Sequence, residues 1–465
     1  MTSKIQFLTG AFASILSTGA FFTYHGKRNT FVNPALYGVS TKGVESELYK
    51  VHEKQSAFRP FLSTLSFLYG YCVDTGYALC AGYGRGKLHF ETGLFGPLRE
   101  ALSVAEILQN KRETCYTKND AKNMLNWIGK PDIEWDHEWK LNESGNWQRD
   151  GKFITPLYNI FPKYLIDKLI NKESKYSYIR YIKPKKNNNN NNVKQQKKKT
   201  KQIPLCLHLP CSGDQTFEWR SNHFANPLAT NDNIASIIII CPFYGQRQVP
   251  NRPVRGVQVD RVSDLFTSGI CLLTESVSLL SYFKDHIPEH HDGKFIVCGI
   301  SMGASIAGLL ATFSPIPFNM VAVAPSHSAA SLWRDGVMNK VCAWDTLQEF
   351  ANDNKNGMGS ILNGQSANEY VYKQLEKTDI RYFQIPFNFL PENERPKHHI
   401  LIAGINDAYI PTNTVNMVAH RFKNTCSLRW TLGGHATLVV LHKQLVRDSI
   451  REVALKIMSA KEDSV

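Results

Sequence analysis

Short apolar runs alternate with longer amphipathic segments over most of the second half of the chain. Short runs rich in Val, Ile and Leu are typical of strands that are buried on both faces. Between the later runs and after the last one, apolar residues recur every three to four positions, as in residues 436–458, and this spacing predicts helices. The predicted strands are Phe153–Leu157, Tyr176–Lys183, Pro204–Leu209, Ile237–Cys241, Phe295–Cys298, Met320–Ala324, Ile400–Ala403 and Leu428–Leu432.

Strands that alternate with helices predict an α/β fold with a mostly parallel, doubly wound sheet. Functional groups of such folds gather at the carboxyl edge of the sheet. No strand-like run occurs between the sixth and seventh predicted strands, so residues 325–398 are expected to form a cap insertion. Its residues Trp333 and Trp344 and the segment Phe383–Leu390 either line an acyl pocket or form the core of the cap itself.

One serine occupies the turn between a predicted strand and a predicted helix. Gly299-Ile300-Ser301-Met302-Gly303 directly follows the fifth predicted strand. Glycines on both sides of a serine allow the close backbone approach of a sharp strand-to-helix turn, which exposes the hydroxyl as a nucleophile elbow. The five-residue motif is common by chance, so its context has to decide.

The context supplies an acid and a base in a suitable order. Asp407 follows the seventh predicted strand, and His435 follows the eighth, after Gly433-Gly434 and on a loop expected to be flexible. The order nucleophile, acid, histidine is that of α/β-hydrolases. We therefore expect Ser301, Asp407 and His435 to form a triad in which His435 is the general base and Asp407 holds its tautomer. The alternative makes Asp407 a turn residue and His435 a capping residue.

An acyl transfer of this kind also needs hydrogen-bond donors for the oxyanion. The amide of Met302, directly after the nucleophile, is one candidate. The other comes from the loop after the third predicted strand, where Cys211 or Ser212 follows Pro210, which has no N–H to donate. An ordinary β-turn without a catalytic part is the alternative.

These motifs, with Asp407-Ala408-Tyr409-Ile410-Pro411 and Pro242-Phe243-Tyr244-Gly245-Gln246-Arg247, resemble the α/β-hydrolase domain-containing protein 18 family. The resemblance covers roughly residues 65–455 and implies an α/β-hydrolase fold. The sequence departs from the family pattern at Ala304, Asn406 and Pro210-Cys211. We expect residues 61–465 to form the hydrolase domain and residues 1–60 to form a targeting or anchor extension.

The net charge of +14 is partly local. Residues 183–201 carry eight lysines around a run of asparagines, a composition typical of disorder. Because this insertion separates the second and third predicted strands, it is interpreted as an enlarged hairpin tip. It is either a solvated loop or attracted to an anionic membrane surface, and no base-stacking or groove-reading motif supports a nucleic-acid partner. The sequence gives no indication of the oligomeric state.

The N-terminus combines an apolar run, Phe7–Phe22, with flanking basic residues and has no acid before Glu45. This pattern predicts mitochondrial import, with an ER or secretory signal and an ordinary buried helix as alternatives. A second apolar stretch, Phe61–Gly82, contains Asp74 and is interpreted as an interfacial or docking helix. Cys206, Cys241 and Cys298 fall in predicted strands, and neither a disulfide framework nor metal-ligand spacing is evident, so no cofactor or metal is expected.

We expect a serine hydrolase that cleaves carboxylic esters of lipids through an acyl-enzyme. The family resemblance implies a membrane-associated mitochondrial phospholipid deacylase, with cardiolipin as the sharpest version. Arg247, Arg252 and Arg255 follow the fourth predicted strand and are candidate phosphate contacts, or else solvated arginines paired with Asp260 or Asp264. The alternatives are a lipid esterase of another compartment and a non-catalytic scaffold.

Overall fold

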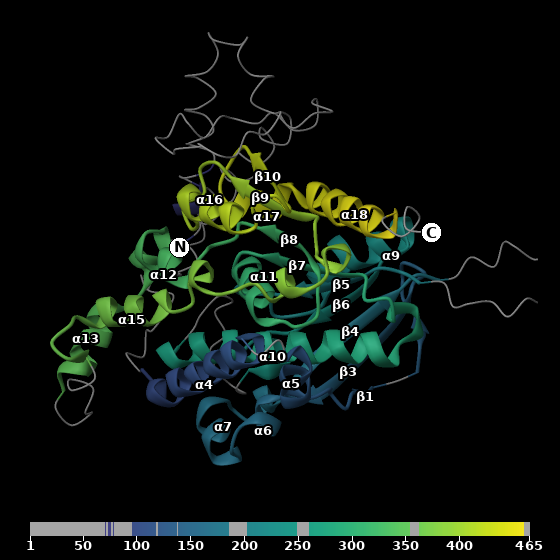
Figure 1. Ribbon diagram of the computed structural model, residues 1–465. Coiled ribbons are helices and arrows are strands. Elements are labelled where there is room, and N and C mark those ends of the chain that lie inside the picture. The colour runs from purple at the N-terminus through teal and green to yellow at the C-terminus, as the bar shows by residue number, and fades with distance from the viewer. Residues whose placement is uncertain are drawn as a thin grey trace, which may run out of the picture.

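The computed structural model describes residues 95–459 except 118–119, 137, 186–201, 249–259 and 354–361, together with Gly70, residues 73–75 and Ala78. One ten-stranded sheet runs through the molecule (Figure 1), and its strands follow the order β1-β3-β4-β6-β5-β7-β8-β9-β10, with β2 paired to β3. The strands are β1 Glu134–Trp135, β2 Lys140–Leu141, β3 Trp147–Ile154, β4 Tyr176–Lys183, β5 Leu205–Leu209, β6 Ala235–Ile239, β7 Phe295–Ile300, β8 Asn319–Val323, β9 His399–Gly404 and β10 Cys426–Thr431.

The sheet has a parallel part and an antiparallel part. Strands β6, β5, β7, β8, β9 and β10 are parallel, whereas β1 to β4 are paired antiparallel and β4 joins β6 antiparallel. Side chains of β5 to β9 are buried on both faces, as the continuous apolar runs predict. The predicted α/β fold with a mostly parallel sheet is therefore confirmed.

Helices cover both faces of the parallel part. Helices α11, α10, α4 and α5 stack on one face, while α9 and α18 cover the other with α17 beside them (Figure 1). The helices are α4 Leu98–Thr117, α5 Ala121–Ile128, α6 Leu157–Ile160, α7 Lys163–Leu169, α8 Glu218–Arg220, α9 Asn226–Asp232, α10 Val262–His286, α11 Met302–Phe313, α12 Ala329–Arg334, α13 Trp344–Asn352, α15 Ala367–Glu376, α16 Thr412–Arg421, α17 His435–Leu441 and α18 Lys443–Ser459.

Helix α10 is long and apolar enough to cross a membrane by length and composition alone, but 83% of its most apolar window is buried inside the protein. It lies between α11 on one side and α4 and α5 on the other. A helix that is apolar on every side is buried when it lies in the middle of a layered domain. We interpret α10 as the central helix of this face.

Two predictions about the first half of the sheet were wrong. The predicted strand Phe153–Leu157 is the end of β3, a turn and the start of α6. Strand β3 alternates buried and half-buried positions and carries several polar residues, so a search for apolar runs misses most of it. The expected hairpin of the second and third predicted strands is also absent, because β6 lies between β4 and β5.

The lysine-rich insertion lies largely outside the described residues, but its attachment points are described. Lys183 ends β4, which runs antiparallel to β6, and Leu205 begins β5, which runs parallel to β6. Both points therefore lie at the amino edge of the parallel strands. The loops after β5, β7, β9 and β10 lie at the opposite, carboxyl edge.

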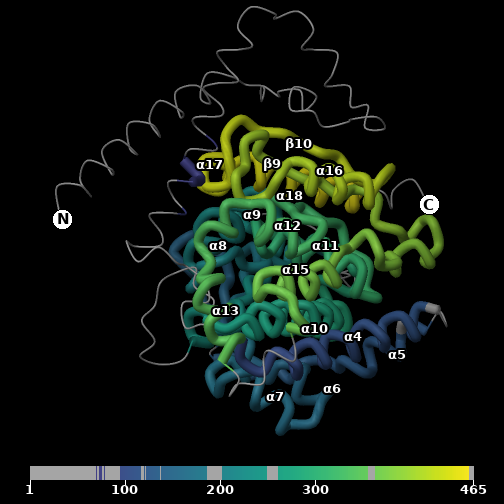
Figure 2. The backbone as a smooth tube through the Cα atoms, turned by 90° about the vertical axis from the view of Figure 1, so that its left-hand side faces the viewer, coloured from purple at the N-terminus to yellow at the C-terminus, as the bar shows by residue number. Residues whose placement is uncertain are grey.

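The segment between β8 and β9 contains α12, α13 and α15, which pack side by side (Figure 2). Trp333 of α12 is buried and lines the internal cavity described below. Trp344 instead packs edge-on against Tyr372 and donates its indole N–H to Asn339, so it belongs to the core of the cap. Trp333 therefore lines the cavity, as one interpretation expected, and Trp344 belongs to the core of the cap, as the other expected.

The described cysteines are free thiols. Cys206 in β5, Cys298 in β7 and Cys241, just after β6, are all buried. They fill the sheet as small apolar side chains do.

Candidate active site

Ser301 sits at a strained turn between β7 and α11. Its φ of 56° and ψ of −116° are unusual for a residue with a side chain. A Cβ atom on Gly299 would lie 2.1 Å from the carbonyl oxygen of Gly303, and one on Gly303 would lie 2.8 Å from the carbonyl oxygens of Leu209 and Pro210. Both glycines are therefore required by the close backbone contacts that expose Ser301.

The loops after β7, β9 and β10 bring three side chains into one hydrogen-bonded chain. The Nε2 atom of His435 lies 2.8 Å from the Oγ atom of Ser301, and its Nδ1 atom lies 2.7 Å from Oδ2 of Asp407. The carboxylate accepts from Nδ1–H, which leaves Nε2 free to accept the hydroxyl proton of Ser301. The structure thus brings together Ser301, Asp407 and His435 in the arrangement that a serine nucleophile needs.

Backbone amides hold Asp407 in place. Its Oδ1 atom accepts hydrogen bonds from the amides of Tyr409 and Ile410, each at 2.8 Å, so only Oδ2 faces the imidazole. Burial lowers the pKa of His435, but the charge of Asp407 and its hydrogen bond, with a further contribution from Asp74, raise it above the usual 6.5 overall. The site therefore stabilises the imidazolium that forms when the base takes up a proton.

The imidazole also has an aromatic neighbour. The ring of Tyr409 stacks on His435 with centroids 4.8 Å apart and an interplanar angle of 25°. This contact restricts rotation of the imidazole from a side that Asp407 does not reach. In the sequence, Tyr409 is distinguished only as part of the segment that follows Asp407.

The expected oxyanion donors lie beside the nucleophile. Met302 is the first residue of α11, so its amide has no acceptor within the helix. Cys211 and Ser212 line the same cavity as Ser301. Their loop is anchored because Arg220 donates to the carbonyl of His208 at 2.7 Å and pairs with Asp214.

Ser301 opens into a cavity of about 420 Å³. Its walls come from α4, α10, α11, α17 and the cap, and most of the lining side chains are apolar. Met302, Ile306, Leu309 and Phe313 form one continuous apolar row of α11 along it. At the rise of an α-helix this row spans roughly 17 Å. The cavity thus extends from the nucleophile along the length of α11.

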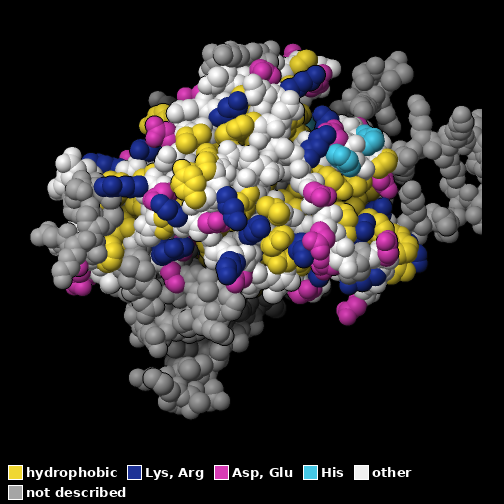
Figure 3. All heavy atoms as spheres, turned by 90° about the horizontal axis from the view of Figure 1, so that it is seen from below, with side chains coloured by type: hydrophobic (Ala, Val, Ile, Leu, Met, Phe, Trp, Pro, Cys, Tyr) yellow, Lys and Arg dark blue, Asp and Glu magenta, His cyan; other side chains and the backbone are white. Residues whose placement is uncertain are grey.

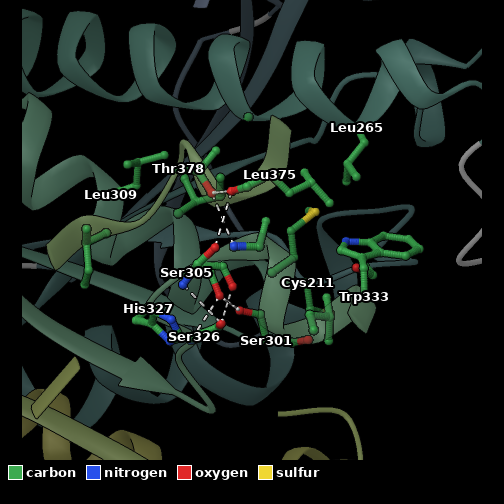
Figure 4. A pocket seen from close by; sticks show the side chains of 18 of the residues that line it. Cys211, Leu265, Ser301, Ser305, Leu309, Ser326, His327, Trp333, Leu375 and Thr378 are labelled. Atoms are coloured by element: carbon green, nitrogen blue, oxygen red, sulfur yellow. Dashed lines mark hydrogen bonds between the residues drawn. The ribbon is translucent and has the colours of Figure 1, made fainter. Parts of the chain in front are cut away.

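A polar group interrupts the apolar wall next to the nucleophile. Ser305, Ser326 and His327 gather close to Ser301, whereas Leu265, Leu309 and Trp333 stand around the rest of the cavity (Figure 4). The Ser305 hydroxyl accepts from the amide of Ser326 at 3.1 Å, which ties the start of the cap to α11.

The assignment of Arg247 to a phosphate is wrong. Its side chain is fully buried and pairs with Glu275 at 2.8 Å, and it donates to the carbonyls of Ile240 and Ser174. A guanidinium with these partners is not available to a ligand, and it is also not the solvated loop arginine of the alternative. Arg252 and Arg255 lie outside the described residues.

The structure adds a carboxylate that the sequence analysis did not assign to the site. Asp74, fully buried, accepts from the amides of Ala408, His435 and Ala436. The signal available in the sequence was a lone acid within the apolar stretch Phe61–Gly82. Among the described residues, no group of three or more His, Cys, Asp or Glu side chains has the geometry of a metal site.

A parallel sheet with antiparallel edge strands, a serine elbow, and an acid and a histidine on later loops together define an α/β hydrolase. The chain is similar at low identity to several solved structures. Acetyl xylan esterase 1 from a Thermoanaerobacterium species shares 15% identity over 73% of this chain and 93% of its own, with a TM-score of 0.44. Est1E from Butyrivibrio proteoclasticus shares 15% identity over 61% of this chain and 96% of its own, with a TM-score of 0.36.

The sequence comparison is more specific. The family described as "Alpha/beta hydrolase domain containing 18" matches residues 102–456. The chain belongs to this family, which confirms the resemblance seen in its motifs.

Proposed function

We propose that this protein is a serine ester hydrolase that removes long acyl chains from lipids. The observation that carries the proposal is the Ser301–His435–Asp407 chain of hydrogen bonds at the mouth of an elongated apolar cavity. An acyl chain lying along α11 transfers apolar surface from water and presents its carboxyl carbon to Ser301.

In the proposed reaction, the Oγ atom of Ser301 attacks the ester carbonyl carbon while His435 takes the hydroxyl proton of Ser301. The resulting oxyanion accepts hydrogen bonds from the amide of Met302 and one of the Cys211–Ser212 loop. The tetrahedral intermediate expels the alcohol, which takes the proton from His435, and leaves an acyl-serine. Water, activated by the same imidazole, then releases the fatty acid and restores Ser301.

The phospholipid version of this proposal, with cardiolipin as its sharpest form, rests on the family resemblance. Arg252 and Arg255 remain candidate phosphate contacts, and Arg247 does not. Changing Arg252 and Arg255 to Glu should weaken activity on anionic vesicles more than on zwitterionic ones. Equal losses of activity on both vesicle types would contradict selection of an anionic head group by these arginines, and the proposal would reduce to a lipid esterase.

Mitochondrial and membrane association are proposed from the sequence of residues 1–28. A fusion of residues 1–60 to a fluorescent protein should colocalise with mitochondria, and fluorescence in the ER or outside the cell would contradict mitochondrial localisation.

Lys and Arg side chains are mixed with Asp and Glu side chains on the face of the protein seen in Figure 3. The distribution of charge therefore does not mark this face as one that would bind an anionic membrane surface.

The cavity supplies the direct test of the acyl-chain proposal. Leu309→Trp places a large side chain in the middle of the apolar row of α11, whereas Leu455→Trp makes the same change at a position of α18 that is 64% exposed. Leu309→Trp should lower the turnover of palmitoyl esters relative to acetyl esters, and Leu455→Trp should leave the ratio unchanged. An unchanged ratio in Leu309→Trp would show that the acyl chain does not occupy this cavity.

A non-catalytic scaffold is the alternative from another class. A fluorophosphonate probe that labels the wild-type protein at Ser301 contradicts it, because labelling requires an activated serine. An unlabelled, folded protein would support it.

A further inference from the structure

Asp74 connects two loops that each carry a member of the triad. Its Oδ2 atom accepts from the amides of Ala408, at 3.0 Å, and His435, and its Oδ1 accepts from the amide of Ala436 at 2.8 Å. Ala408 directly follows Asp407, and Ala436 directly follows His435. One carboxylate therefore fixes the backbone on both sides of the Asp407–His435 hydrogen bond.

The backbone around Asp74 is packed just as closely. A Cβ atom on Gly434 would lie 2.2 Å from Oδ2 of Asp74 and 2.7 Å from the carbonyl oxygen of Gly70. A Cβ atom on Gly70 would lie 2.7 Å from the backbone of Gly433 and Gly434. The loop before His435, expected to be flexible, is instead held against Gly70 and Asp74. This packing explains why glycine is required directly before His435.

We propose that Asp74 is a positioning residue of the catalytic centre, which locks the Asp407 loop to the start of α17 so that the imidazole of His435 stays between Asp407 and Ser301. The role deepens the proposed function and rests on it. Asp74 precedes the residues 102–456 that match the family, so the catalytic centre of this chain is completed by a segment outside the matched part.

The charge of Asp74 has a second effect on the base. Burial and repulsion by Asp407 raise the pKa of Asp74 to about 6, against the opposing charge of His435 and the amide hydrogen bonds. In turn, Asp74 contributes to the raised pKa of His435. Asp407 and His435 are the charged groups that act on Asp74, so removing its charge should lower the pKa of His435.

Asp74→Asn tests the role because it keeps the shape and removes the charge. Three amides then face one acceptor oxygen and one NH₂ group, so at least one amide loses its partner. The matched control is Asp120→Asn, since Asp120 also accepts a backbone amide, that of Asn123 at 3.1 Å, but at the start of α5. Asp74→Ala removes all the acceptors and gives a second, stronger variant.

The first measurement is hydrogen exchange and does not depend on activity. In the wild type, the amides of Ala408, His435 and Ala436 should be protected, and Asp74→Asn should speed their exchange while Asp120→Asn does not. Exchange of these amides at the solvent rate in the wild-type protein overturns the proposal without any variant. This measurement on the wild-type protein also tests the hydrogen bonds to Asp74 if either Asp74 variant fails to fold.

The second measurement is the rate of fluorophosphonate labelling as a function of pH. Asp74→Asn should slow labelling on the order of 10²-fold, as expected for a displaced catalytic group, and should move the acidic limb to lower pH. A loss of protein stability alone would lower the amount of folded enzyme without moving the limb.

Wild-type protein that is not labelled overturns the proposed hydrolase function, while the exchange data still decide the contacts of Asp74. Wild-type and Asp74→Asn proteins that label at the same rate, with the same pH profile, overturn the positioning role and leave the hydrolase function intact.

Discussion

The Oγ atom of Ser301 and the Nε2 atom of His435 lie 2.8 Å apart, although 134 positions separate these residues in the chain. The carboxyl edge of the parallel strands brings them together, because Ser301 follows β7 and His435 follows β10. Several contacts fix this distance from outside the pair, and each of them can be tested.

Ser301→Ala should abolish ester cleavage and fluorophosphonate labelling without unfolding the protein, because the side chain only loses its oxygen. Loss of a triad member lowers the rate on the order of 10⁴-fold. Activity and labelling, with the melting temperature as a fold check, measure the effect. Ser305→Ala is the matched control, since Ser305 lines the same cavity one helical turn away, and its labelling should persist. Labelling that survives in Ser301→Ala would place the nucleophile elsewhere, for instance at Ser305 or Ser326.

Asp407→Asn and His435→Ala should each reduce kcat severely, and combining either with Ser301→Ala should cause little further loss. In the proposed mechanism, the three side chains act on one transition state, and a single chain of hydrogen bonds links them. Turnover of one ester by the single and double variants measures the coupling. Losses that multiply fully would mean that the residues act independently.

The rate of hydrolysis should fall as the pH is lowered through the pKa of His435. Only the neutral imidazole accepts a proton, and its pKa in the folded protein lies above 6.5. Below this pKa the neutral fraction of His435 falls with each drop in pH, and kcat/KM should fall with it. Residual activity of Asp407→Asn should show its acidic limb at lower pH, because the main group that raises this pKa is then uncharged. A limb that stays in place would assign it to another group.

Gly303→Ala should destabilise the protein, whereas Gly308→Ala on the same helix should not. The new methyl group at position 303 would lie 2.8 Å from the carbonyl oxygens of Leu209 and Pro210, while at position 308 its nearest neighbour is Cδ1 of Ile380 at 3.6 Å. We expect a loss of about 1–3 kcal/mol in the free energy of unfolding for Gly303→Ala, and a gain of up to about 1 kcal/mol for Gly308→Ala. Denaturant titration measures both values, and equal stabilities would contradict the tight elbow.

Arg247→Ala should act on stability and not on lipid selection. It leaves the carboxylate of Glu275 buried without its cation, which typically costs about 3–5 kcal/mol. The double change to Arg247→Met and Glu275→Leu should recover much of this loss, because no charge is then buried alone. A stable Arg247→Ala variant with altered preference for anionic vesicles would reverse this assignment.

The parallel half of the fold and the triad could be predicted because their signals are local. Ser301 is flanked by the glycines that its turn requires, and Asp407 and His435 each follow a continuous apolar run. Most of strand β3 was not predicted, because several of its residues are polar and the strand does not form an apolar run. Arg247 was misassigned because a single arginine after a strand gives no sign of its partner Glu275, which belongs to the next long helix.

Asp74 could not be assigned from the sequence for a related reason. Its amide partner at His435 is 361 positions away, and a single acid in an apolar stretch carries no motif. Only the folded structure shows why position 434 requires glycine: the carboxylate of Asp74 occupies the space that a Cβ atom at this position would need.

The attachment of residues 186–201 at the amino edge makes this connection a natural place to vary the chain. Lengthening a connection that is already long adds little closure entropy, because the cost grows only with the logarithm of its length. Its two ends are also separated from Ser301 by the whole length of the strands. Inherited expansions of the asparagine run, or an inserted affinity tag, should therefore be tolerated by an otherwise intact protein. The position is equally suited to attaching a reporter for following the protein in living cells.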